Sequence, residues 1–92
     1  VVRGNEATYS GGGIYNKDSG LVMLKGSSSI RGNEATYGGG VHNWGWLTMK
    51  GSSSIRANTA SDFGGGVFSM GARVGVTCGG NVRHNTPDNC GP

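Results

Sequence analysis

"RGNEATYSGGG" at residues 3–13 and "RGNEATYGGG" at residues 31–40 are nearly identical peptides, and they set the period of the whole 92-residue chain. A third and looser copy, "RANTASDFGGG", occupies residues 56–66. Self-similarity at a regular period is the signature of a repeat architecture, in which each unit stacks on the next. The composition agrees, because 20 glycines and a hydrophobic content of 34% provide little material for a conventional globular core.

Every copy places an aliphatic residue and an arginine shortly before an asparagine. These asparagines are spaced by 28, 25 and 27 residues, and they are Asn5, Asn33, Asn58 and Asn85. After the glycine triplet comes a second segment, "GIYN" at 13–16, "GVHN" at 40–43 and "GVFS" at 66–69, and then a third segment. The copies differ in length at two points only, before the triplet, where Ser10 is extra, and after the second segment. Loops and corners tolerate such insertions, so the segments between them are predicted to be strands.

The segments alternate inward and outward residues as β-strands do. The inward residues of the second segment are Ile14, Val41 and Val67. Those of the third are Val22, Leu47 and Val74, followed two residues later by Leu24, Met49 and Val76. The sequence therefore predicts an all-β fold, a right-handed parallel β-helix (β-solenoid) of about three coils with three short strands each. The predicted single domain spans residues 1–92, with coils at 2–29, 30–54 and 55–81 and a C-terminal stub or cap at 82–92.

Like residues lie above like residues in such a fold, because successive coils rise by about 4.8 Å, the spacing of paired strands. The four asparagines are then expected to form a ladder of side-chain amides at a bend, each amide both donating and accepting. The cysteines, Cys78 and Cys90, fit no zinc or redox spacing. A disulfide in an extracellular setting and two free thiols are both consistent with the sequence.

The order of these motifs, Ile-x-x-Asn, then Ala, then Gly-Gly-Gly-Ile, resembles the FxxN and GGA[ILV] repeats of chlamydial polymorphic outer-membrane proteins. It is also similar to right-handed parallel β-helix repeats in secreted and surface proteins of bacteria and archaea. The resemblance covers residues 2–90, although this chain has Ile or Val in place of Phe, and Gly13, Gly40 and Gly66 where the family often has Ala. It implies a surface or adhesin role and no reaction.

The titratable residues form no catalytic constellation. Enzymes that cleave polysaccharides on this fold use clustered carboxylates, whereas here only Glu6 and Glu34 share a position of the repeat. We expect these two glutamates to balance the neighbouring arginines. His42 and His84 lie at different phases of the repeat, which predicts exposed or turn histidines and no metal site. The glycine-rich peptide lacks the lysine of a phosphate loop, and no cofactor is expected.

Two outward-facing columns are candidates for contact with other molecules. The first is a basic stripe, balanced by the glutamates, by solvent or by an anionic polysaccharide, and its members are Arg3, Arg31, Arg56 and Arg83. The second is a column of rings formed by Tyr15, His42 and Phe68. Such rings stack on sugars, or pack under a loop or against a neighbouring molecule.

The sequence favours a non-enzymatic extracellular or cell-surface protein, a structural or adhesive segment or subunit of a stalk or fibre. Its expected partners are further coils or copies of the same protein, at the open ends of the solenoid, and surface glycans. The alternative is a carbohydrate-binding module for acidic polysaccharide that uses the arginine or ring column. A net charge of +3 without a Lys/Arg run does not indicate nucleic-acid binding, and no apolar stretch approaches the roughly 20 residues of a membrane span.

Overall fold

The computed structural model describes residues 1–91, and these contain strands but no helix. Residue 92, the last of the expected C-terminal stub, lies outside the described residues. In chain order the strands are β1 (Val2–Arg3), β2 (Ile14–Asn16), β3 (Leu21–Leu24), β4 (Ser29–Arg31), β5 (Glu34–Tyr37), β6 (Val41–Asn43), β7 (Trp46–Met49), β8 (Ser54–Arg56), β9 (Thr59–Phe63), β10 (Val67–Ser69), β11 (Ala72–Val74), β12 (Val82–Arg83) and β13 (Cys90–Gly91).

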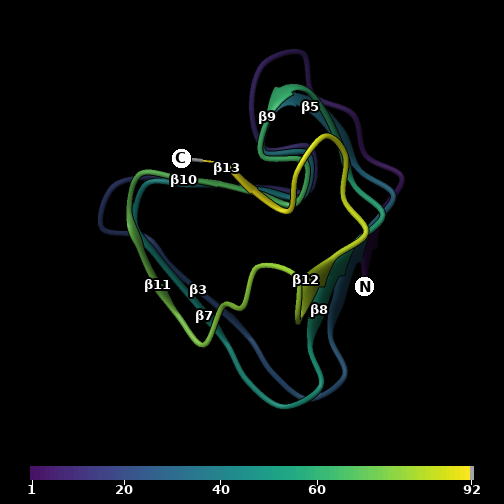
Figure 1. Ribbon diagram of the computed structural model, residues 1–92. Helices are drawn as coiled ribbons and strands as arrows, with labels where there is room; N and C mark the ends of the chain where they lie inside the picture. The colour runs from purple at the N-terminus through teal and green to yellow at the C-terminus, as the bar shows by residue number, and fades with distance from the viewer. Residues whose placement is uncertain (92) are drawn as a thin grey trace.

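The strands form four parallel sheets that run along the stack of coils. Their orders are β1-β4-β8-β12, β13-β10-β6-β2, β11-β7-β3 and β5-β9. Figure 1 looks along the stack, so successive coils lie over one another, and the chain turns counterclockwise as it comes towards the viewer. The predicted β-solenoid of about three right-handed coils is therefore confirmed.

The second and third coils contain a fourth strand that the sequence did not predict. This strand is the "EATY" stretch, β5, and its counterpart β9. The two pair with an irregular register, because Ala35 lies opposite Ala60 while Tyr37 lies opposite Phe63. In the first coil the same stretch makes only single bridges, at Glu6 and Ser10. Together these segments form the lobe at the top of Figure 1, which folds away from the main triangular coil.

Ser10 is the residue that the first copy has in excess, and it pairs with Tyr37. Tyr9 therefore has no place in the stack and is 76% exposed. The position of the insertion follows the prediction, but the tyrosines of the first two copies are not structurally equivalent.

The core consists of aliphatic ladders from three of the sheets. One ladder joins Val2, Ile30, Ile55 and Val82, and another joins Ile14, Val41, Val67 and Cys90. The members inside the stack are 0% exposed, as is Leu47 of the third sheet. Burying one such side chain contributes about 1.5–3 kcal/mol.

The inward position predicted for Val74 is wrong. Arg73 is the residue in register with Leu47, whereas Val74 pairs with Thr48 and is 50% exposed. The turn at Met70–Gly71 has the same length as the turn at Trp44–Gly45, and the Ala72 amide donates to the Gly45 carbonyl at 2.8 Å. Strand β11 therefore starts one residue earlier than the apolar pattern suggested.

The glycine triplets make the corner between the lobe and the main coil. Gly38, the first of its triplet, has a φ of 65°, in the left-handed region that other residues disfavour. At Gly39 the constraint is space, because a Cβ there would overlap the backbone oxygens of Thr59 and Gly65 in the next coil. The first glycine thus sets the bend and the second allows the coils to stack closely.

The asparagine ladder runs through all four copies. Each side-chain amide donates from Nδ2 to Oδ1 of the asparagine in the next coil at 3.0 Å, from Asn5 to Asn33, from Asn33 to Asn58 and from Asn58 to Asn85. Each Oδ1 also accepts the backbone N–H of the preceding asparagine at 2.9 Å. Because Asn33 and Asn58 are 1% exposed, the ladder satisfies polar groups that water does not reach.

A second polar ladder lies at the end of the β2, β6 and β10 strands. Asn16 Nδ2 donates to Asn43 Oδ1 at 2.8 Å, and Asn43 Nδ2 donates to Ser69 Oγ at 3.1 Å. The signal for it was the last residue of "GIYN", "GVHN" and "GVFS", which is Asn, Asn and then Ser.

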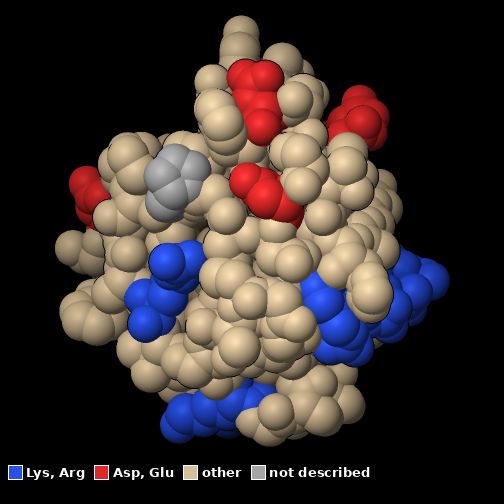
Figure 2. Space-filling model, viewed as in Figure 1, with Lys and Arg blue, Asp and Glu red and all other residues tan. Residues whose placement is uncertain are grey.

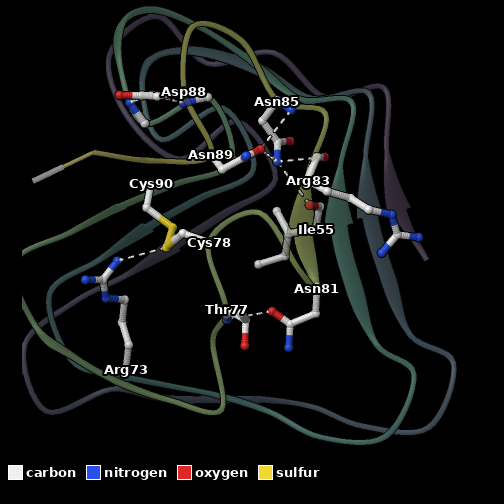
Figure 3. The surroundings of a disulfide bond; sticks show 12 residues. Ile55, Arg73, Thr77, Cys78, Asn81, Arg83, Asn85, Asp88, Asn89 and Cys90 are labelled. Atoms are coloured by element: carbon white, nitrogen blue, oxygen red, sulfur yellow. Dashed lines mark hydrogen bonds between the residues drawn. A yellow bond between two sulfur atoms is a disulfide. The ribbon is translucent and has the colours of Figure 1, made fainter.

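The C-terminal end of the stack is closed by side chains from residues 77–90. Asn89 Oδ1 accepts from Asn85 Nδ2 at 3.2 Å and so ends the asparagine ladder, while Asp88 Oδ1 accepts the backbone N–H of Gly64 at 2.7 Å. Cys78 and Cys90 form a disulfide with a Cα–Cα distance of 5.8 Å, which spans the open mouth of the last coil (Figure 3). A bond that closes a loop of this size contributes about 3 kcal/mol. Arg73 Nη1 lies beside it, 3.7 Å from Cys78 Sγ.

The N-terminal edge has no such closure among the described residues. Val2, Ile14 and Val22 are only partly buried, although the residues stacked on the first two are 0% exposed. Leu21 is 68% exposed. Asn5 Oδ1 accepts no hydrogen bond from residues 1–91, because its ladder runs only towards the C-terminus. Within residues 1–91, a cap is therefore present at the C-terminal side of the stack alone.

We predict that Asn58→Ala lowers the free energy of unfolding by about 3 kcal/mol, because it leaves the buried N–H of Asn33 without an acceptor and removes two donors. Asn5→Ala is the matched control at the exposed edge, with an expected loss of about 1 kcal/mol or less. Urea unfolding of both variants measures the difference. Equal losses would show that position within the ladder has no effect.

Candidate functional site

The arginine column lies on the outer face of the sheet β1-β4-β8-β12. Direct register pairs Arg3 with Arg31, Arg31 with Arg56 and Arg56 with Arg83. The strand pleat explains this placement, because the aliphatic residue before each arginine points into the core and the arginine therefore points outwards. Figure 3 shows Arg83 extending away from the coil interior.

A groove of about 420 Å³ follows the column over the first three coils. Its lining consists of three arginines and the residue after each one, namely Arg3, Gly4, Arg31, Gly32, Arg56 and Ala57. The residues that follow the arginines all have left-handed backbone, with φ of 68° at Gly4, 65° at Gly32, 56° at Ala57 and 57° at His84. Such a conformation costs about 1 kcal/mol or more at the two residues that are not glycine, so the shape of this surface is imposed by the fold.

The structure shows no direct pairing of these arginines with Glu6 or Glu34, and the expected balance of charge stays a prediction. The two glutamates stack on each other across one coil and are exposed, but no ion pair joins any arginine and any carboxylate of residues 1–91. Figure 2 shows a basic patch on the flank that carries β8 and β12, and the acidic groups lie apart from it, towards the lobe and on the opposite side. Part of the column is also desolvated, because Nε of Arg31 is buried without a hydrogen-bond partner.

The ring column is largely a packing cluster rather than an exposed surface. Its central ring, His42, is only 6% exposed, so the predicted exposed histidine is wrong at this position. His42 meets Tyr15 edge-on at 5.1 Å and Phe68 edge-on at 4.9 Å between ring centroids. Tyr37 of the lobe lies 5.3 Å from Phe68 and covers the column from outside. The sequence could not place Tyr37 there because the lobe itself was not predicted.

One end of the column remains accessible. Tyr15 and Trp44 are 49% and 40% exposed, and together with Lys17 and Asp18 they line a hollow of about 450 Å³. The ring centroid of Trp44 lies 5.6 Å from that of His42, and Trp44 was not among the predicted site residues. The signal for it was the "WGW" turn, which projects an aromatic ring next to the column.

His84 differs from His42 in its exposure to solvent and in its backbone conformation. It is exposed, and it occupies the left-handed position after Arg83 that glycine holds in the first two coils. Residues 1–91 contain no group of three or more His, Cys, Asp or Glu side chains placed to hold one metal ion. They also contain no helix long and apolar enough to cross a membrane.

Burial lowers the pKa of His42 below its usual 6.5. A lowered folded-state pKa means that protonation favours the unfolded chain, so His42 costs no stability above about pH 6.5, and the fold loses stability as the pH falls below that value. We predict that His42→Phe removes this acid-induced loss, since Phe68 already fills the equivalent position one coil further on. The loss is measured as the change in the free energy of unfolding between about pH 7.5 and pH 5. If His42→Phe shows the same pH dependence as the wild type, His42 is not the group that causes the loss.

Comparison with known proteins agrees with this architecture. The Chlamydia polymorphic membrane protein (Chlamydia_PMP) repeat model matches residues 1–17, the first copy of the motif, from β1 into the first residue after β2. No curated protein and no solved structure matches the chain. The predicted resemblance to polymorphic-membrane-protein repeats is thus confirmed by the match at residues 1–17, in a chain that folds as a β-solenoid.

Proposed function

We propose that the chain is a non-enzymatic structural unit of an extracellular stalk or fibre at the cell surface, with an adhesive outer face. The difference between its two ends carries this proposal. A side-chain cap and a disulfide close the C-terminal end, whereas the N-terminal edge offers half-buried aliphatic side chains and an unused amide acceptor. An edge of this kind is suited to receive one further coil of the same repeat.

The use of the repeated polar residues supports a structural role. The asparagines are engaged in ladders, and the hydroxyls of Ser28 and Ser53 donate to the carbonyls of Lys25 and Lys50 within their own turns. Glycine triplets form the corners. Most of what the sequence repeats is therefore accounted for by stacking and turning.

The disulfide and the family match support the surface location. Disulfides persist in oxidising compartments such as the cell exterior and the periplasm. The repeat that matches residues 1–17 is described from membrane proteins of Chlamydia. A solenoid whose length grows by one coil spacing per repeat is a suitable element for a stalk, because rigidity comes from continuous ladders along its axis.

We predict that a second copy of residues 30–54, inserted directly before Val2, adds one coil in register and raises the free energy of unfolding by about 3 kcal/mol. The insertion would bury the exposed parts of Val2, Ile14 and Val22. The matched control appends the same peptide after residue 92, where the cap blocks stacking, and should leave stability unchanged. Equal effects of the two insertions, measured by urea unfolding, would contradict the difference between the ends.

We also predict that antibodies against the folded chain label intact, unpermeabilised cells that produce the protein. Labelling should persist without reductant and should not increase on permeabilisation, because the chain is expected outside the cytoplasm. Labelling that requires permeabilisation would rule out the surface role while leaving the solenoid itself untouched.

A further inference from the structure

We propose that the arginine column is a binding site for a linear polysaccharide that carries a carboxylate on successive sugars. The site comprises Arg3, Arg31, Arg56 and Arg83 together with the groove beside the first three. This proposal goes beyond the structural role, since it assigns a ligand class to one face of the solenoid and does not depend on what stacks at the ends.

The arginines of the column have no carboxylate partner within the described residues. Four guanidinium groups in consecutive coils repel one another, because the coil spacing of about 4.8 Å is shorter than the screening length of about 8 Å at physiological ionic strength. No carboxylate of residues 1–91 pairs with them. An anion bound along the column would remove this repulsion, so the ligand-free state is the less favourable one.

The position of Arg31 also favours a ligand: its Nε is buried without a hydrogen-bond partner, so the terminal nitrogens Nη1 and Nη2 are the donors left to a ligand. A guanidinium carries five N–H donors in a planar fork that matches a carboxylate in a bidentate way. Arg31 lies between Arg3 and Arg56 in backbone register, and its buried Nε shows that the side chain is partly enclosed before any ligand binds. Less side-chain entropy is therefore lost on binding than for an isolated surface arginine.

The shape of the groove and the spacing of its charges also favour a linear polymer. The left-handed Gly4 and Gly32 leave open space beside the arginines, since a Cβ on Gly4 would meet nothing within 4 Å. The charges repeat once per coil, about 4.8 Å, which is close to the length of one pyranose ring in an extended chain. A linear polymer with one carboxylate per sugar therefore carries its charges at an axial spacing similar to that of the arginines, and the carboxylates on the side that faces the column are the ones that bind.

A nucleic acid fits these observations less well. The chain has a net charge of only +3, and four of its eight Lys and Arg residues lie in the single arginine column. The groove lining contains no aromatic side chain on which a base could stack. The narrow, strictly periodic charge pattern favours the uronate polymer.

The test compares two double variants that each remove two positive charges from adjacent coils. Arg31→Gln/Arg56→Gln alters the column, and Lys25→Gln/Lys50→Gln is the matched control, because both lysines are exposed and follow the paired residues Leu24 and Met49. Binding to polygalacturonate is measured by calorimetry, with neutral dextran and single-stranded DNA as comparison probes.

We expect the arginine variant to lose at least about tenfold in affinity for polygalacturonate and the lysine variant less than about twofold. A third variant, Arg31→Lys/Arg56→Lys, keeps the charge and should still weaken binding because it loses the planar fork. Without ligand, the arginine variant should be at least as stable as the wild type, which also shows that it folds. Equal losses in both double variants, binding to dextran as strong as to polygalacturonate, or stronger binding to DNA would each overturn the proposal.

Discussion

The side-chain amide ladder is the interaction on which the rest of this structure depends. Asparagine can donate from Nδ2 and accept at Oδ1 at the same time, so one residue per coil extends a hydrogen-bonded chain without end. Here the chain of amides passes from Asn5 through Asn33 and Asn58 to Asn85, and the Oδ1 atom of each asparagine after Asn5 also accepts a backbone N–H. Asn33 and Asn58 are buried at the bend that turns the chain into the lobe, and these bonds satisfy the polar groups that water does not reach there.

A ladder of this kind constrains the sequence and creates a problem at its ends. Each coil must supply the same residue at the same point, which is why the peptide repeats. In the last coil, another side chain must then accept the hydrogen bond that the asparagine of a following coil would accept. Asn89 provides it only four residues after Asn85, and Cys90 continues the aliphatic ladder of Val67 while joining Cys78. The cap is thus a compressed substitute for a fourth full coil.

The sequence predicted correctly which residues stack from coil to coil. It did not predict the contacts between different parts of one coil. The register of Asn5, Ile30 and Arg31 follows from the repeat alone, and the structure has these residues in the expected stacks. The lobe strands were missed because "EATY" is short and its one buried residue, Ala35, is small, and Tyr37 could therefore not be placed next to Phe68. Val74 was misplaced because its turn was taken to be longer than it is. His42 was misplaced because an outward residue is still buried when the rings of Tyr15, Phe68 and Trp44 surround it.

The same stacking that favours asparagine disfavours arginine, and this contrast separates architecture from function on this molecule. An amide ladder gains a hydrogen bond with every added coil, whereas a guanidinium column gains repulsion. The repeated glycine, asparagine and aliphatic positions are explained by the fold, since a change at any of them removes a contact that the coils need. Arg3, Arg31, Arg56 and Arg83 make no ion pair within residues 1–91, and one of their donors is desolvated. No hydrogen bond or ion pair within residues 1–91 accounts for their repetition, and this is the observation that supports the acidic polysaccharide proposed above as the ligand of the column.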